Sequence, residues 1–289
     1  MATTRYPELD LDLTFHPVQC ARASALTPEQ ITQYNEEGYV NPITLFAREQ
    51  HEGILRRFQQ TDPASTKPLN PHSRLGWVYD LVANPQLLGY MQDILGSNVI
   101  CFISQYIDKL PGSGTLVPVH QDAAYFAVDA RATVKAWLAL EDADTSNGCM
   151  WICPGSHKLG ALEVRDQNRD LNLVDAVRED VVRGFGKTPL EVKAGQVVFF
   201  STLLVHLSPG NPSDSRHRRA LTMAYGRAES RPHTHPKAKH APVLCSGRDI
   251  QGNWPLLPCP VIDLLSDQLS WRADRQFKSS WACVCSPGK

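Results

Sequence analysis

The sequence has little of what marks a secreted, membrane-bound or nucleic-acid-binding protein. Its formal net charge is −1 over 289 residues, which gives no reason to expect nucleic acid or an anionic membrane as a partner. No apolar run approaches the roughly 20 residues that a membrane span needs. Residues 1–8 lack the apolar core of a signal peptide. These absences favour a cytoplasmic protein that binds neither a membrane nor nucleic acid.

The sequence contains cysteines, but their spacing does not indicate a disulfide framework. The chain is long enough to bury a sizeable core without disulfides. Cys149 and Cys153 flank a strand-like segment, yet a zinc site would need two more ligands at close spacing, and none appear. Cys283 and Cys285 form an oxidisable or metal-binding pair, and reduced thiols are the simpler interpretation. The eight positions are 20, 101, 149, 153, 245, 259, 283 and 285.

The residue pattern changes from helical to strand-like near residue 98. Helices are predicted at about 27–37, 45–60 and 78–94, the first with Thr27 as N-cap and Pro28 in its first turn. Short β-rich runs separated by Gly, Pro and Asn turns follow. The eight predicted strands lie near 99–107, 116–121, 133–140, 149–153, 189–193, 197–201, 203–208 and 219–227.

This order predicts a mainly β fold with flanking α-helices and a double-stranded β-helix core, a jelly-roll of the cupin-like kind. We expect one domain over 1–289: helical support (1–97), jelly-roll core (98–228) and C-terminal extension (229–289). The polar stretch 161–188 is predicted to be an insert that forms a lid or a wall of the substrate pocket. A surface helix is the alternative interpretation.

The segment around His120 and Asp122 is the strongest chemical signal. Side chains at i and i+2 of a strand point to the same face, so an imidazole and a carboxylate are expected to converge. His-x-Asp alone is common by chance. His206, at the end of an apolar run, supplies a third group. Two histidines and one carboxylate form the facial triad of non-haem Fe(II) oxygenases, which leaves coordination positions open.

Basic residues follow the second histidine closely. Arg216, Arg218 and Arg219 precede a strand-like run that begins at Ala220. The planar fork of arginine binds a carboxylate bidentately. A metal with open positions beside such an anchor suits 2-oxoglutarate, which chelates iron through its keto acid and is held by its far carboxylate.

Three ordered motifs make the segment from about 67 to 225 resemble the phytanoyl-CoA dioxygenase (PhyH) family of Fe(II)/2-oxoglutarate-dependent oxygenases. They are HQDAAYF at 120–126, KAWLALEDADTSNGCMWICPGSHK at 135–158 and AGQVVFFSTLLVHLSPGNPSDSRHRRALTMAY at 194–225. The resemblance implies an oxidoreductase that uses Fe(II), 2-oxoglutarate and O2. It implies that the metal ligands are His120, Asp122 and His206.

The resemblance also implies a cosubstrate pocket. Its carboxylate-binding arginine falls on Arg218, beside Ser208, with Trp137 and Gln105 lining the pocket. The loop before Arg218 is one residue longer than usual, so Arg219 is the alternative. A family lysine falls near Lys67, and Asp108 stands where the family often has asparagine.

The substrate is less well specified. Tyr125, Phe126 and Arg227 are the candidate contacts, although Tyr125 and Phe126 could equally belong to the core. No basic run marks a CoA-phosphate site. We expect hydroxylation of an unactivated C–H bond of a small molecule from secondary metabolism, by a monomer or homodimer. The alternatives are desaturation, oxidative ring formation or a non-catalytic metal-binding barrel.

Overall fold

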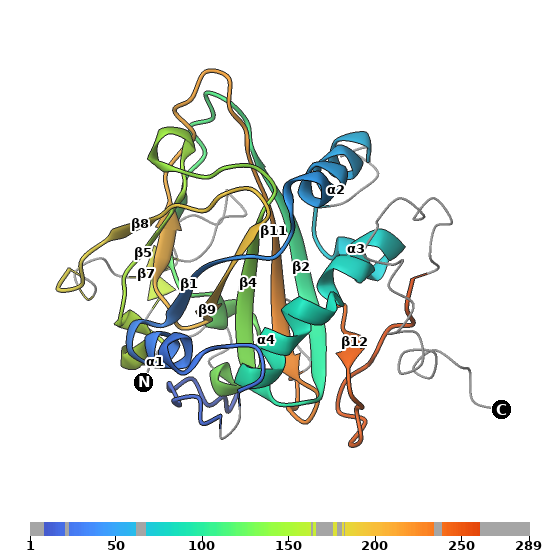
Figure 1. Ribbon diagram of the computed structural model, residues 1–289. Helices are drawn as coiled ribbons and strands as arrows, with labels where there is room; N and C mark the ends of the chain where they lie inside the picture. Colours follow the sequence, from blue (N-terminus) through green and yellow to red (C-terminus); the bar gives the residue numbers. More distant parts are fainter. Residues whose placement is uncertain are drawn as a thin grey trace.

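Two antiparallel sheets face each other in the computed structural model, which describes residues 9–20, 23–61, 68–162, 164–165, 176–177, 181, 183–233 and 239–260 (Figure 1). The larger sheet has the order β1 (Tyr39–Thr44), β9 (Gln196–Ser201), β4 (Thr133–Ala139), β11 (Arg218–Arg227), β2 (Val99–Lys109), β12 (Val243–Ser246). The smaller sheet has the order β3 (Val117–His120), β10 (His206–Ser208), β5 (Met150–Ile152), β8 (Thr188–Leu190).

The predicted fold class is confirmed, and each of the eight predicted strands is present. The sequence did not predict β1 and β12, which lie at the two edges of the larger sheet. Within the insert, β6 (Val164–Arg165) and β7 (Ala176–Val177) pair antiparallel, while most of the rest of 161–188 lies outside the described residues. Short 3-10 helices complete the loops: η1 (Pro71–Ser73), η2 (Asp122–Tyr125), η3 (Ala130–Ala132), η4 (Thr145–Asn147) and η5 (Ser156–Leu159).

In the part of the chain that the structure describes, four α-helices precede the barrel or cover it. α1 (Pro28–Glu37) begins with a capping box between Thr27 and Gln30, and α2 (Arg48–Gln60) follows β1. The third predicted helix is in fact two, α3 (Gly76–Val82) and α4 (Pro85–Leu95), because Pro85 cannot continue a helix. Asn84 accepts hydrogen bonds from the first amides of α4 and caps it. None of the helices that the structure describes is long and apolar enough to cross a membrane.

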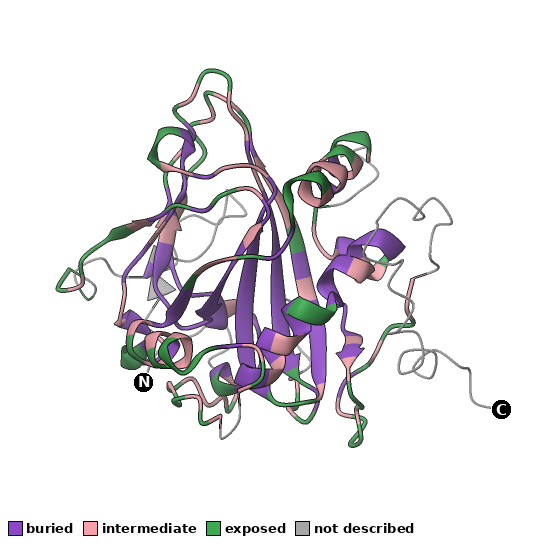
Figure 2. Cartoon of the chain, viewed as in Figure 1, coloured by how far each residue is buried: buried purple, intermediate pink, exposed green. Residues whose placement is uncertain are grey.

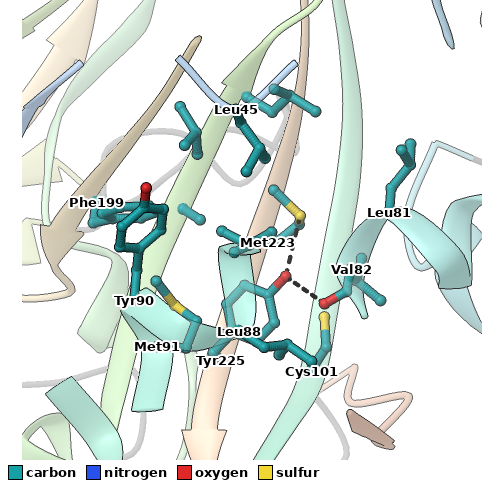
Figure 3. Close-up of a cluster of buried hydrophobic side chains, with 14 of the residues drawn as sticks. Leu45, Leu81, Val82, Leu88, Tyr90, Met91, Cys101, Phe199, Met223 and Tyr225 are labelled. Atoms are coloured by element: carbon teal, nitrogen blue, oxygen red, sulfur yellow. Dashed lines mark hydrogen bonds between the residues drawn. The ribbon is translucent and has the colours of Figure 1, made fainter. Parts of the chain in front are cut away.

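One face of the larger sheet packs against α3 and α4 (Figures 1 and 2). On β11 this face carries Leu221, Met223 and Tyr225, all buried, and the Tyr225 hydroxyl donates to the Val82 carbonyl at 2.9 Å (Figure 3). Burial of a residue of this size contributes on the order of 2 kcal/mol. Because side chains alternate along a strand, Arg218 and its even-numbered neighbours on β11 point into the barrel.

Candidate active site

Three potential metal ligands converge between the sheets. His120 ends β3 and His206 begins β10, and the two residues are paired in register with ring centroids 4.0 Å apart. Asp122 opens η2. Its Oδ1 is 3.8 Å from His120 Nε2 and its Oδ2 is 3.9 Å from His206 Nε2. Among the described residues, these three form the only cluster in which such ligand atoms lie within 4.8 Å of one another.

The convergence has a different cause from the one expected. β3 ends at His120, so Asp122 is directed by the 3-10 turn and not by strand alternation. The intervening Gln121 fixes that turn, because its buried amide donates to the Gly160 and Leu203 carbonyls and accepts from the Leu162 amide. The residue between the two ligands therefore sets the angle between them.

Both histidines are prepared to bind a metal through Nε2. His120 Nδ1 lies 2.8 Å from the Pro118 carbonyl and His206 Nδ1 lies 2.9 Å from the Leu204 carbonyl, so each Nδ1 donates and each Nε2 presents its lone pair. Burial lowers the pKa of His120 to about 3 and lowers the pKa of His206, so both rings are neutral.

The carboxylate completes the fit. Burial alone would raise the pKa of Asp122, but Lys135 and the two histidines outweigh it and hold that pKa below its usual value. Asp122 Oδ2 is buried and accepts no hydrogen bond from any described residue. Two neutral imidazoles and an ionised carboxylate with an unsatisfied oxygen suit a divalent metal such as Fe(II).

Arg218 lies deep in the barrel without a carboxylate partner among the described residues. It is 3% exposed, and its Nη2 donates a long hydrogen bond to Ser208 Oγ at 3.4 Å. Its Nε is buried and unpaired. The guanidinium carbon lies 5.7 Å from the Trp137 ring. A buried cation with unused donors is a ready receptor for an anionic group.

Two further residues of this pocket were not expected from the sequence. Lys109, which pairs with Arg218 across the β2–β11 ladder, is buried and donates to Ser208 Oγ at 2.7 Å. Burial, and then Arg218, lower the pKa of Lys109 to about 7. Thr222 Oγ1 is buried and unpaired between Gln105 and Trp137 on the neighbouring strands. Because side chains alternate along a strand, Lys109 lies on the same face as Gln105, and this signal could have placed it in the site.

Arg219 and Asp108 lie on the opposite face of the same strands. Arg219 Nε donates to Asp108 Oδ2 at 3.0 Å, and its Nη1 donates to Glu141 Oε1 at 3.2 Å. His217 also bonds Asp108 at 2.8 Å. Because this network faces away from the barrel, Arg218 and not Arg219 points at the pocket, and the Asp108 charge does not enter it.

The other predicted site residues differ in burial and in their distance from the triad. Gln105 is exposed on the inner face of β2, opposite to the buried Ser104. Tyr125 is half-buried, its ring 6.5 Å from that of His120. Phe126 is buried against Phe102 at 5.2 Å.

Arg227 is exposed at the end of β11 remote from Arg218. It lines a separate cavity of about 600 Å³ with residues 14–20 of the N-terminal arm. Of the remaining candidates, Lys67, Cys283 and Cys285 lie outside the described residues.

One more charged residue lies beside the triad. Lys135 projects from the inner face of β4, and its Nζ is 3.4 Å from Asp122 Oδ2, an ion pair not aligned as a hydrogen bond. The ammonium also lies 5.3 Å from the centroid of the Phe126 ring. Lys135 was assigned no role from the sequence, although it opens the motif at 135–158, because the sequence does not show that it lies beside Asp122.

Two facing antiparallel sheets with an inward 2-His-1-carboxylate set are the arrangement of jelly-roll non-haem iron oxygenases. The family model of phytanoyl-CoA dioxygenase (PhyH) matches residues 19–220, more than half of the chain. The chain therefore belongs to the phytanoyl-CoA dioxygenase family, as the motifs predicted.

Two curated relatives match half of the chain or less at 32–40% identity. The peroxisomal phytanoyl-CoA dioxygenase of Bos taurus is 32% identical over 151 residues, 50% of this chain and 44% of the relative. Phytanoyl-CoA dioxygenase 1 of Oryza sativa subsp. japonica is 40% identical over 121 residues, 41% of this chain and 42% of the relative. The chain thus spans under half the length of these two relatives.

Solved structures share the fold at low sequence identity. EctD from S. alaskensis, solved with 2-oxoglutarate and 5-hydroxyectoine, has a TM-score of 0.67 at 18% identity, covering 81% of this chain and 89% of EctD. The non-haem monooxygenase ThoJ has a TM-score of 0.64 at 22% identity, covering 85% of this chain and 95% of ThoJ. The α-ketoglutarate-dependent carbocyclase SnoK has a TM-score of 0.62 at 21% identity, covering 74% of this chain and 89% of SnoK. These likenesses establish the fold.

Proposed function

We propose that the protein is an Fe(II)- and 2-oxoglutarate-dependent dioxygenase that hydroxylates an unactivated C–H bond of a small molecule, a secondary-metabolism intermediate. The observation that carries this proposal is the pairing of two features in one barrel. A triad with two Nε2 atoms and a carboxylate oxygen that accepts no hydrogen bond from the described residues lies beside a buried arginine with an unused donor. The first suits Fe(II), and the second suits a carboxylate of the cosubstrate.

Each residue of the site has a distinct task in this proposal. His120, Asp122 and His206 would hold the iron, and the carbonyls behind the histidines keep both rings in the required tautomer. Arg218 and Ser208 bind the distal carboxylate of 2-oxoglutarate. Iron with its cosubstrate supplies the activation of O2 for oxidation of the C–H bond.

Three further residues shape the cosubstrate pocket in this proposal. Lys109 adds a second cation to the carboxylate anchor, because it shares the Ser208 hydroxyl with Arg218. Trp137 and Thr222, buried on neighbouring strands, form its wall and exclude water.

A second outcome on the same centre is desaturation or oxidative ring formation. SnoK, whose fold this chain shares, is a carbocyclase, so this barrel supports more than one outcome. In this proposal the same triad would serve hydroxylation, desaturation or ring formation, and the residues that hold the substrate would determine which product forms.

The test is a substrate panel incubated with the protein, Fe(II) and 2-oxoglutarate under heavy-isotope dioxygen. Hydroxylation is expected to place one labelled oxygen in the product and the other in succinate. A product that has lost two hydrogens without gaining label would assign desaturation or ring closure. Iron binding without succinate formation across the panel would favour a non-catalytic barrel.

The oligomeric state, monomer or homodimer, stays a prediction that gel filtration can check. The cytoplasmic location stays a prediction that cell fractionation can check.

A further inference from the structure

We propose that the substrate carries a carboxylate and that Lys135 is the residue that binds it, beside the metal. This inference rests on the dioxygenase function proposed above and goes further by naming the chemical class of the substrate. It starts from the position of Lys135, in the middle of a strand whose seven residues are all buried.

Lys135 lies on the inner face of β4. Its neighbours across the ladder are Ala224 of β11 and Phe200 of β9, and Trp137, two residues along β4, shares its face. The side chain keeps only 10% of its surface exposed. Burial of an ammonium is unfavourable unless the charge is paired, so a lysine at this position requires an anion.

Among the described residues, the carboxylate that pairs with Lys135 is Asp122, at 3.4 Å. Metal binding engages that same carboxylate, because Asp122 is the only acid of the triad. A divalent cation bound to Asp122 would draw on the same negative charge that compensates Lys135. The one carboxylate would then be shared between two cations, and a second anion beside Lys135 would restore the balance.

The charge balance of the barrel interior supports this reading. Among the described residues, the inward-facing charges that surround the site are one carboxylate, Asp122, and three amine or guanidine side chains, Lys109, Lys135 and Arg218. Fe(II) and the 2-oxoglutarate dianion bring equal and opposite charges. The excess of positive charge therefore persists in the loaded site, even when Lys109 is neutral.

Distance along the sheet separates Lys135 from the cosubstrate anchor. Lys135 is paired with Ala224, which lies six residues along β11 from Arg218. At about 3.3 Å per residue, the backbones of Ala224 and Arg218 are roughly 20 Å apart. Trp137 lies between the two levels and stacks near Arg218. Lys135 therefore serves the substrate side of the metal and not the distal carboxylate of 2-oxoglutarate.

The surroundings of Lys135 define the rest of the ligand. Phe126 lies under the ammonium, and the half-buried Ile103 occupies the next strand beyond Ala224. The net charge of the loaded site, one positive charge when Lys109 is neutral, matches a monoanion such as a carboxylate better than a phosphate dianion. The site thus fits a monocarboxylate with an apolar body.

The experiment compares acids with their amides in protein loaded with Fe(II) and saturating 2-oxoglutarate, without oxygen. The probes are benzoate against benzamide and octanoate against octanamide, with calorimetric affinity and Tm as readouts. Saturating 2-oxoglutarate keeps the acids away from Arg218. Wild type is expected to prefer each acid on the order of 10- to 100-fold, the range for hydrogen bonds to charged groups.

Variants assign that preference to Lys135. Lys135→Met should abolish it and Lys135→Arg should keep it. Lys193→Met, at an exposed lysine paired with Asp142, is the matched control and should change nothing. The Tm of each variant without probe shows whether it is folded.

The possible failures are distinguishable. Equal binding of acid and amide by wild type, or an acid preference that survives Lys135→Met, overturns the proposal. A loss of iron affinity in Lys135→Met with the acid preference intact would also overturn it, because Lys135 would then only position Asp122. If wild type forms succinate but shows no acid preference, the dioxygenase function stands and only this inference falls. If wild type binds neither iron nor 2-oxoglutarate, both fall.

Discussion

Replacing Arg218 with methionine is expected to weaken 2-oxoglutarate binding strongly while leaving the unliganded protein at least as stable as wild type. Methionine keeps most of the buried aliphatic stem and removes the guanidinium. Loss of one partner from a buried charge pair costs on the order of 2–5 kcal/mol. At about 1.4 kcal/mol per tenfold, the Kd of 2-oxoglutarate should rise roughly 30-fold to several-thousand-fold.

The stability of the unliganded protein should change in the opposite direction. Burial lowers the pKa of Arg218 to about 10, so the fold disfavours its charged form. At about 1.4 kcal/mol per pKa unit, keeping this guanidinium charged at neutral pH costs on the order of 3 kcal/mol. Removal of the charge relieves that cost, and the unliganded variant is expected to melt at or above the wild-type Tm.

Arg219→Met is the matched control for this pair of measurements. Arg219 is bonded to Asp108 and Glu141 on the outer face, so its loss should leave the Kd of 2-oxoglutarate nearly unchanged. The assay is a calorimetric titration of 2-oxoglutarate into Fe(II)-loaded protein without oxygen, with a thermal melt of each unliganded variant. A binding defect in Arg219→Met with normal binding by Arg218→Met would refute the assignment of the anchor.

Three other outcomes are expected. His120→Ala, Asp122→Ala and His206→Ala should each abolish iron-dependent turnover with the far-UV circular dichroism unchanged; full iron affinity in any one of them would remove that residue from the triad. Burial lowers the pKa of Lys109 to about 7, and only its protonated form adds a positive charge beside Arg218. The affinity for 2-oxoglutarate should therefore fall as pH rises above 7, and Lys109→Met should flatten that profile; an equally steep profile in the variant would exclude Lys109. Chloride or bromide should give no halogenated product, as mass spectrometry can check, because in the proposed site Asp122 would take the position that a halide needs; a stoichiometric halogenated product would contradict Asp122 as a ligand.

Local patterns were enough to predict much of the fold. The run Val99–Lys109 and the strands around His206 and Ala220 are β-rich between Gly, Pro and Asn turns, and they form the predicted strands. β1 and β12 were missed because edge strands depend on the neighbours that pair with them, which a linear pattern does not contain.

The site shows where prediction from sequence ends. The triad was predicted from spacing and resemblance, but the assumed strand geometry at Asp122 was wrong, because Gln121 anchors a turn through partners 39 to 82 residues away. Lys109 and Lys135 escaped notice for a related reason. Their significance comes from burial and from their neighbours: Lys109 lies beside Arg218 on the adjacent strand, and Lys135 lies near Asp122. These are properties of the assembled sheets.

The measurement that tests the central claim most directly is release of succinate from 2-oxoglutarate by the purified protein, with and without Fe(II), beside Asp122→Ala. The account predicts succinate from wild type only when Fe(II) and O2 are both present, increased by a cognate substrate, and none from the variant. Succinate formation that is unchanged without iron or in Asp122→Ala, or its absence from iron-loaded wild type across a broad substrate panel, would contradict the account.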